Sequence, residues 1–386
     1  MKRFLTVLAG VALLVPALAQ GATKVKIGFI NSITGPEAPI GENLSNGVTL
    51  AIEDLKKEGI DVDLLKEDDT GKPEKSMAAF EKLGESDKVA GIVGPYSSKC
   101  ASALAKLAEK YKVPLIIPVA SKDDITRQKL TWTFRLSATA TDYATILLDM
   151  ATKLGKLKTM AIINENTDFG TSGAKAAETY GNTKGIKVVA IEAYSPGSPD
   201  YRSTLASIKS KNPDIVFMVS YVADAILLMR QSREIGLTPK AFLGAGAGFA
   251  TVQFAKEKDI SNGVFSSTQW TPDVSWPGTK QFNERYQKQF GKEPTYHATT
   301  AYESMIIMAE TAAKAKEDRS RMRDLLKRGK WNGVMGEVKF ADYNGYFNQN
   351  KHPMLVQQII NGVHETVWPP QFAPKKPVYP FPGWAK

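Results

Sequence analysis

The sequence predicts an α/β protein with two doubly wound units, each built on a parallel β-sheet. From residue 25 onward, short runs of β-branched and apolar residues alternate with amphipathic stretches of helical length. The alternation pauses after the first unit and then restarts, and a chain of 386 residues corresponds to about two domains of ordinary size. Because parallel strands need crossover helices, we expect helices on both faces of each sheet.

The first unit contains four expected strands and three expected helices. One helix is marked by apolar residues that recur at helical spacing on one face, which places Cys100 in the core. That face consists of Cys100, Leu104, Leu107 and Tyr111. The expected strands are Val25–Ile30, Val62–Leu65, Val89–Val93 and Leu115–Ile117, and the expected helices begin near Asn43, Pro73 and Ser97.

The second unit begins after a short β-like stretch at Trp132–Phe134. Pro213 and Pro239 each stand just before an expected strand, where a proline ends the preceding helix without removing a hydrogen bond from the sheet. Helices are expected over Tyr143–Leu154, after Asp168, from about Asp200 and through Leu227. The expected strands are Met160–Ile163, Val188–Ile191, Ile215–Val219 and Ala241–Leu243.

The last part of the chain predicts two helices and a β-hairpin. The helices are expected at Thr279–Phe290 and Ala298–Ala313. Two apolar runs, Met354–Ile360 and His364–Val367, flank an Asn-Gly dipeptide that suits the two left-handed positions of a type I′ turn. The tail, Trp368–Lys386, carries six prolines and should lack regular structure.

Composition and charge exclude several classes of protein. With 43% hydrophobic and 23% charged residues, the chain is typical of folded globular proteins and unlike disordered or polytopic membrane proteins. Its net charge of +10 comes from basic residues scattered along expected helix faces, not from a basic cluster. We therefore expect a solvated surface and no nucleic-acid partner.

The N-terminus predicts export from the cytoplasm. Lys2 and Arg3 precede an apolar run that ends in a small-x-small triplet, the pattern of a cleaved signal peptide. The run is shorter than the ~20 residues of a membrane-spanning helix, so we expect residues 1–19 to be removed and the mature chain to be periplasmic without membrane insertion. The single cysteine, Cys100, excludes an internal disulfide and a lipid-modified cysteine at the cleavage site.

Motifs for catalysis and cofactor binding are absent or incomplete. The three histidines show no metal-ligand spacing. The run Gly244–Gly248 misses the Gly-x-Gly-x-x-Gly pattern because Phe249 holds the sixth place, and the Ser-x-x-Lys match at Ser172 lacks its partner motifs. We therefore expect no metal, no cofactor and no catalytic residue.

Two strand-to-helix turns offer hydrogen-bond donors for an anion. The segment Gly94–Ser98 leads from a strand into a helix, so the hydroxyls of Ser97 and Ser98 lie near unpaired N–H groups at the positive helix end. The segment Ile117–Ser121 follows the next strand, at the sheet edge where α/β proteins bind ligands. The alternative is that these serines only cap the helix, which would still leave donors for a carboxylate.

These segments, in this order, strongly resemble the periplasmic branched-chain amino-acid-binding proteins, the leucine-binding-protein-like type I solute-binding proteins of ABC transporters. The matching segments are Lys26–Ile30, Thr34–Pro36, Gly94–Ser98, Val113–Ser121, Asn164–Gly170 and Asp200–Asp214. The resemblance implies two lobes joined by a three-stranded hinge. It implies an N-terminal lobe of residues 20–137 and 269–342 and a C-terminal lobe of residues 138–268 and 343–386.

The resemblance also implies a ligand site between the lobes. Ser98, Ala120 and Ser121 occupy positions that, in the family, bind the carboxylate and nearby polar atoms of the ligand. Phe169 and Tyr221 match aromatic positions of the second lobe, where Tyr221 would close over the ligand. Core packing is the alternative role for these residues. Ile40 stands where leucine-type binders can carry a tyrosine.

Gly246 is the main departure from the family, whose glutamate at this position neutralises the ammonium group of the ligand. A buried ammonium without a counter-charge is costly, so either another carboxylate replaces the glutamate or the ligand has no ammonium group. The missing side chain would leave space whose flat apolar lining could come from Tyr96, Phe169, Tyr221 and Trp270. Candidate replacement carboxylates, left unranked, are Asp224, Asp273 and Glu303.

The resulting expectation is a monomeric periplasmic receptor that captures a hydrophobic amino acid or a related, possibly aromatic, carboxylate and delivers it to an inner-membrane ABC permease. Hinge closure would trap the ligand. Two alternatives remain: a sensory receptor that docks on a signalling protein, and a periplasmic enzyme acting on a small acid. The enzyme would need a nucleophile or base with a partner in the cleft, and the sequence offers none.

Overall fold

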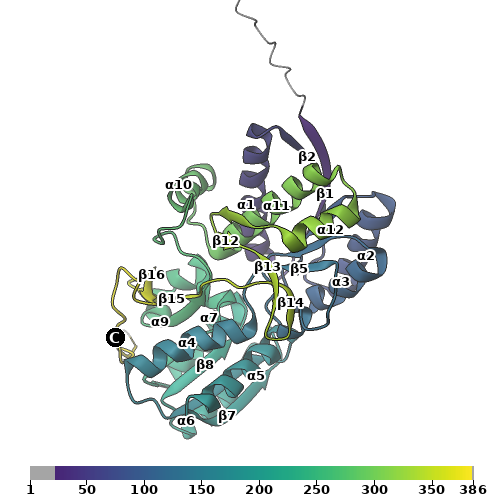
Figure 1. The fold of residues 1–386 in the computed structure, drawn as a ribbon. Coiled ribbons are helices and arrows are strands. Elements are labelled where there is room, and N and C mark those ends of the chain that lie inside the picture. The colour runs from purple at the N-terminus through teal and green to yellow at the C-terminus, as the bar shows by residue number, and fades with distance from the viewer. Residues whose placement is uncertain (1–21, 385–386) are drawn as a thin grey trace, which may run out of the picture.

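Two seven-stranded β-sheets, one in each lobe, organise the chain (Figure 1). The computed structural model describes residues 22–384, so the expected signal peptide at 1–19 lies outside the described residues. Within the described part, no helix is both long enough and apolar enough to cross a membrane. The expected fold class, two α/β lobes with doubly wound sheets, is confirmed.

The sheet of the N-terminal lobe has the strand order β13-β14-β5-β4-β3-β1-β2. Strands β1 to β5 are parallel, whereas β13 and β14 form an antiparallel hairpin in which β14 lies parallel to β5. The strands are β1 (Thr23–Asn31), β2 (Ile60–Asp68), β3 (Gly91–Val93), β4 (Leu115–Ile117), β5 (Thr133–Arg135), β13 (Phe340–Tyr343) and β14 (Tyr346–Asn350). A separate small sheet pairs β11 (Trp331–Gly333) with β12 (Gly336–Val338).

Helices from both ends of the sequence cover this first sheet. Helix α1 packs against α11, which comes from more than 200 residues later in the chain, and α2 packs against α3 (Figure 1). The helices are α1 (Ala38–Lys57), α2 (Pro73–Glu81), α3 (Ser98–Tyr111), α10 (Thr279–Phe290), α11 (Tyr296–Ala315) and α12 (Arg319–Arg328). A π-helical turn at Lys82–Ser86 and a 3-10 turn at Asp123–Ile125 complete the lobe.

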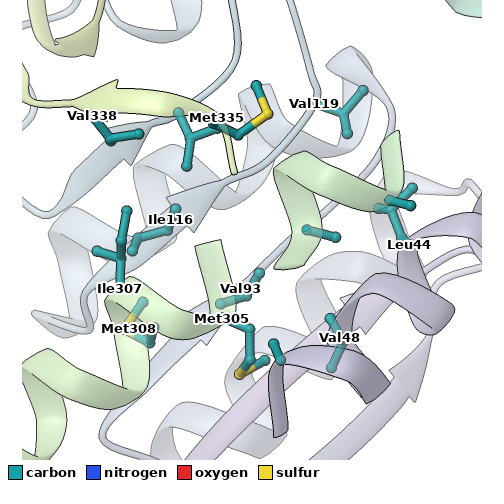
Figure 2. Close-up of a cluster of buried hydrophobic side chains, with 14 of the residues drawn as sticks. Leu44, Val48, Val93, Ile116, Val119, Met305, Ile307, Met308, Met335 and Val338 are labelled. Carbon is teal, nitrogen blue, oxygen red and sulfur yellow. The ribbon is translucent and has the colours of Figure 1, made fainter. Parts of the chain in front are cut away.

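The core of the N-terminal lobe lies between α1, α11 and the sheet. Leu44 and Val48 of α1 and Met305 of α11 are fully buried and lie together in this core (Figure 2). The two helices approach closely because Gly47 has no side chain: a Cβ there would lie 2.1 Å from the carbonyl oxygen of Ala298. Burial of these apolar faces holds the late helix against the early one.

The sheet of the C-terminal lobe repeats the same winding, with the order β16-β15-β10-β9-β8-β6-β7. Five strands are parallel, and β15 and β16 add an antiparallel hairpin at one edge. The strands are β6 (Thr159–Glu165), β7 (Lys187–Tyr194), β8 (Ile215–Val219), β9 (Ala241–Gly244), β10 (Phe265–Thr268), β15 (Leu355–Ile360) and β16 (Val363–Trp368). In both lobes the first five strands follow the order 2-1-3-4-5, so each sheet has a switch point beside its first strand.

The helices of the C-terminal lobe follow the expected alternation. They are α4 (Ala140–Leu154), α5 (Asp168–Thr183), α6 (Arg202–Ser210), α7 (Val222–Glu234), α8 (Val252–Lys256) and α9 (Lys258–Ser261), with a 3-10 turn at Ala247–Ala250. In the part of the C-terminal tail that the structure describes, residues 369–384, there is no regular structure, as expected. The tail packs on this lobe, because the rings of Phe381 and Trp384 contact Phe242.

The chain passes between the lobes after β5, after β10 and after β14. The last crossing comes later than expected: residues 343–350 were assigned to the C-terminal lobe, but β14 lies in the first sheet, where Gln349 pairs with Arg135. The sequence carries a signal for this hairpin, because Asn344 and Gly345 form the same kind of left-handed turn (φ 49° and 79°) as Asn361 and Gly362 in the hairpin of β15 and β16, whose prediction is confirmed.

Candidate functional site

The carboxyl ends of the parallel strands in the two sheets face a small space between the lobes. Its volume is about 10 Å³, about the space that one water molecule needs, so the lobes are closed on each other in this structure. Segments that follow β3 and β4 supply one wall, and segments that follow β6, β8 and β9 supply the other. The lining residues are Tyr96, Ser98, Val119, Ala120, Ser121, Tyr143, Phe169, Tyr221, Ala247 and Tyr296. This space is called the interlobe cavity below.

The wall from the N-terminal lobe presents hydrogen-bond donors. Helix α3 begins at Ser98 with no side chain capping its first turn, so capping by Ser97, the alternative raised above, does not occur. The Ser98 hydroxyl accepts a bond from the backbone N–H of Lys122 at 3.2 Å and keeps its own proton to donate. The carbonyl oxygens of Ala120 and Ser121 already accept bonds from within the protein. This wall therefore offers N–H and O–H groups at a positive helix end.

Arg135 holds the second of these turns in place. The guanidinium is fully buried and donates to the carbonyl oxygens of Ala120 and Lys122, to the Thr126 hydroxyl and to the Gln349 side chain. Burial lowers the pKa of Arg135 below its ordinary value. One cation therefore ties the loop after β4 to strand β14.

The wall from the C-terminal lobe is aromatic. Tyr221, at the start of α7, stacks on Phe169 with 5.0 Å between ring centroids, and its ring lies 5.5 Å from that of Tyr96 in the opposite lobe. Its backbone N–H donates to the carboxylate of Glu165 at 3.4 Å. Burial raises the pKa of Glu165 to about 7. Glu165 was not among the predicted site residues, although it lies inside the segment Asn164–Gly170 that resembles the family.

Three further polar side chains, none of them predicted from the sequence as a site residue, meet beside the cavity. Gln269 donates its amide N–H to the hydroxyl of Tyr143 at 2.7 Å, and that hydroxyl lies 3.4 Å from the hydroxyl of Tyr296. The Tyr296 oxygen also accepts the backbone N–H of Ala247 at 3.2 Å. No sequence signal separates Tyr143 from the apolar residues on the same helix face.

The structure does not bring all predicted residues to the cavity. Tyr96, Ser98, Ala120, Ser121, Phe169 and Tyr221 line it. Ser97 is buried behind the lining, and Trp270 packs in the N-terminal core, where its ring contacts Phe282 and its indole N–H donates to Thr279. Ile40 lines a separate open groove of about 950 Å³ between residues of the two lobes.

Gly246 does not leave the free volume that the sequence suggested. A Cβ at this glycine would lie 3.3 Å from the ring of Tyr143, so Tyr143 fills the space that a larger side chain would need. The glycine also has a backbone φ of +60°, which disfavours other residues.

The candidate replacement carboxylates are all engaged elsewhere. Asp224 accepts the Tyr201 hydroxyl, Asp273 accepts the Thr366 hydroxyl, and Glu303 accepts the backbone N–H of Met335. Among the described residues, none that lines the interlobe cavity carries a carboxylate. An ammonium group in this cavity would lack a direct counter-charge.

A polar contact outside the cavity also joins the lobes. The carboxylate of Asp168, in the first turn of α5, accepts the Ser102 hydroxyl of α3 at 3.0 Å. The same oxygen lies 2.9 Å from the ammonium nitrogen of Lys122. Asp168 therefore joins two donors of the N-terminal lobe to the C-terminal lobe in the closed form.

Known proteins share this architecture over most of its length. Residues 24–363 match the sequence model of the periplasmic binding protein family. The Leu/Ile/Val-binding protein homolog 7 of Brucella suis is 30% identical over 334 residues, which cover 82% of this chain and 83% of that protein.

Two solved structures show the fold. One is the branched-chain amino acid transporter substrate-binding protein LivJ of Streptococcus pneumoniae in complex with isoleucine. It matches with a TM-score of 0.81 and 22% sequence identity, and the match covers 90% of this chain and 100% of that chain. The other is a solute-binding protein of an ABC transporter from Rhodopseudomonas palustris in complex with 3,4-dihydroxybenzoic acid. It matches with a TM-score of 0.78 and 23% sequence identity, and the match covers 87% of this chain and 93% of that chain. The fold and the sequence match agree, and the chain belongs to the periplasmic binding protein family.

Proposed function

We propose that this protein is the periplasmic solute-binding protein of an ABC transporter and that it captures a small carboxylate between its lobes. The observation that carries the proposal is the donor-rich wall at the start of α3. Its helix end has no capping side chain, the Ser98 hydroxyl has a proton to donate, and both features face the interlobe cavity. Such a helix end stabilises a negative charge.

The cavity favours an acid without an ammonium group over an α-amino acid. Relatives with this fold hold either kind of ligand, isoleucine in one and 3,4-dihydroxybenzoic acid in the other. In this chain the lining lacks a carboxylate, and Tyr143 occupies the space beside Gly246. A buried ammonium without a counter-charge is unfavourable, so these contacts support a hydrophobic or aromatic carboxylate.

Hinge closure is the proposed mechanism of capture. The N-terminal lobe binds the carboxylate in the open form, and Tyr221 and Phe169 then close over the apolar part of the ligand. The contacts of Asp168 and the ring pair Tyr96–Tyr221 add to the closed form. A permease in the inner membrane would recognise this closed form, and the protein would act as a monomer without changing its ligand chemically.

A thermal-shift screen tests the proposal. The purified mature protein is heated with amino acids, benzoate-like and cinnamate-like acids and short aliphatic acids, because a ligand that binds only the folded state raises the melting temperature. We expect a carboxylate without an ammonium group to give the largest shift. A largest shift from an α-amino acid would contradict the preference, and no shift from any acid would contradict the proposed function.

A pair of serine substitutions locates the site. Ser98→Ala combined with Ser121→Ala should weaken binding of the best acid by about 1–3 kcal/mol, the cost of losing hydrogen bonds to a charged group. Ser207→Ala is the matched control, because the Ser207 hydroxyl donates to Glu192 on the C-terminal lobe, outside the cavity lining. Unchanged calorimetric affinity in the double variant would show that the carboxylate binds elsewhere.

A further inference from the structure

The tyrosine hydroxyl groups at the interlobe cavity can donate more hydrogen bonds than there are acceptors for them among the described residues. Tyr96 is almost completely buried at 3% exposure, and its hydroxyl has no hydrogen-bond partner among the described residues. It lines the cavity from the N-terminal lobe. A buried hydroxyl without a partner is costly, so its retention at the wall of a binding site indicates that a ligand atom satisfies it.

The pair Tyr143 and Tyr296 contributes a second surplus proton. The amide of Gln269 is oriented by the backbone N–H of Ala138, which donates to its oxygen at 2.8 Å, so its nitrogen must donate to Tyr143. The Tyr296 oxygen already accepts from the Ala247 N–H. The two hydroxyls share one hydrogen bond at 3.4 Å, and the other phenolic proton of the pair has no acceptor among the described residues.

All three phenols stay protonated at neutral pH. Burial raises the pKa of Tyr296 to about 12 and raises those of Tyr96 and Tyr143 well above their ordinary value. They therefore act as neutral donors in the closed form. They lie in both lobes, Tyr143 on α4 and the other two in the N-terminal lobe, so closure assembles them.

We propose that Tyr96, Tyr143 and Tyr296 determine specificity and select a carboxylate that carries a second oxygen acceptor, such as an oxo, hydroxyl or alkoxy oxygen. This inference rests on the proposed function, because the carboxylate itself binds at Ser98 and Ser121. An ammonium group in place of the second oxygen would bring three more protons to a wall that already has surplus donors. The matching α-amino acid and the unsubstituted acid should therefore both bind less tightly.

Calorimetry with two matched ligand series tests the inference. One series is 4-methylpentanoate with its 2-oxo, 2-hydroxy and 2-amino forms, and the other is benzoate with its hydroxy, methoxy and amino forms. We expect at least one oxygen-bearing acid to bind about tenfold or more tightly than its parent acid, the effect of one or more added hydrogen bonds. We expect the amino forms to show no such gain.

Two substitutions assign the gain to the phenols. Tyr96→Phe and Tyr296→Phe should each reduce the gain from the second oxygen, measured in each variant as the ratio of its affinities for the oxygen-bearing acid and for the parent acid. Tyr96→Phe breaks no hydrogen bond in the protein, so it keeps the test valid if Tyr296→Phe fails to fold. Tyr286→Phe is the control, because its hydroxyl bonds Asn46 outside the cavity.

The outcomes separate this inference from the proposed function. If parent acids bind but no oxygen-bearing acid gains affinity, or if the gain persists in Tyr96→Phe and in a folded Tyr296→Phe, the inference is wrong and the proposed function stands. If an amino form binds most tightly, the inference is also wrong. If no carboxylate binds at all, the proposed function fails and the inference fails with it.

Discussion

Asp168→Asn should shift the protein from its closed form toward an open one. In the closed form the Asp168 carboxylate meets Lys122 at 2.9 Å and Ser102 at 3.0 Å, both from the other lobe. The side chains of Lys122 and Asp168 are 24% and 35% exposed, so water screens the pair in part. An asparagine keeps an oxygen for the Ser102 hydroxyl but loses the charge that attracts Lys122.

The size of the effect follows from this partial exposure. A partly exposed ion pair contributes about 1 kcal/mol at most, which corresponds to about a fivefold change in the ratio of closed to open molecules. Asp168 also stabilises the start of α5 through the helix dipole. A double-mutant cycle with Lys122→Met isolates the contact between the lobes. The effect of Asp168→Asn on the start of α5 is the same whether residue 122 is Lys or Met, so it cancels in the cycle.

Spin labels on the two lobes measure the shift. Cysteines that replace Glu42 and Gln253 line the same groove from opposite lobes, and both positions are exposed. Cys100 will not compete for the label, because it is fully buried and burial raises its pKa to about 12. The distance distribution is recorded without ligand and with a saturating carboxylate.

Asp200→Asn is the matched control for this experiment. Asp200 also lies beside the start of a helix and pairs with Arg202, but both residues belong to the C-terminal lobe. We expect this substitution to leave the distances unchanged. Equal distributions in Asp168→Asn and the unsubstituted protein, or equal shifts in the two aspartate variants, would refute the role given to Asp168.

Three further predictions concern buried polar groups. Tyr96→Phe should raise the free energy of unfolding, measured in urea without ligand, by about 1 kcal/mol, because it removes a buried hydroxyl that has no hydrogen-bond partner among the described residues. A lower free energy of unfolding would show that the hydroxyl does have a hydrogen-bond partner. Glu303→Gln should raise the free energy of unfolding relative to the unsubstituted protein, and this gain should be up to about 3 kcal/mol larger above pH 7 than at pH 4. A gain that does not change with pH would contradict the prediction. The reason is that burial raises the pKa of Glu303 from 4.5 to about 7, so the native carboxyl contributes fully below pH 4.5 and loses that contribution as the pH rises through 7. Arg135→Met should lower the free energy of unfolding by about 3 kcal/mol, since four acceptors each lose a hydrogen bond from the guanidinium. Arg127→Met on the exposed surface should change the free energy of unfolding by less than about 1 kcal/mol, and equal effects of the two substitutions would contradict the structural role of Arg135.

Periodicity predicted the repeated α/β core because burial imposes it residue by residue. Each apolar strand lies between two helical layers, and each helix buries one stripe, so the sequence of a strand or helix records its surroundings directly. The hairpin of β13 and β14 was not predicted because β13 is only partly buried and β14 buries mainly polar side chains, so neither strand shows an apolar pattern. Its Asn344-Gly345 turn was the available signal.

The donor-rich wall was predictable for a different reason. A turn from a strand into α3 leaves unpaired N–H groups whatever the rest of the fold does, so Ser98 could be proposed from local sequence alone. The position of Arg135 was not predictable in this way. Its acceptors include Gln349, which lies 214 positions later in the chain, and only the completed sheet brings them together.

Gly246 shows why a missing side chain in a sequence does not define an empty space. Gly246 has no side chain, but Tyr143, about a hundred positions earlier, fills the volume. The phenol ring of Tyr143 therefore stands where the family has a glutamate side chain. The hydroxyl of that phenol is then fixed by Gln269 and by Tyr296, which lies 153 positions away. An apolar helix face predicted Tyr143 as a core residue, and its ring is indeed buried in the core. Its hydroxyl faces the other lobe, so its role depends on how the two lobes close, which no local pattern in the sequence records.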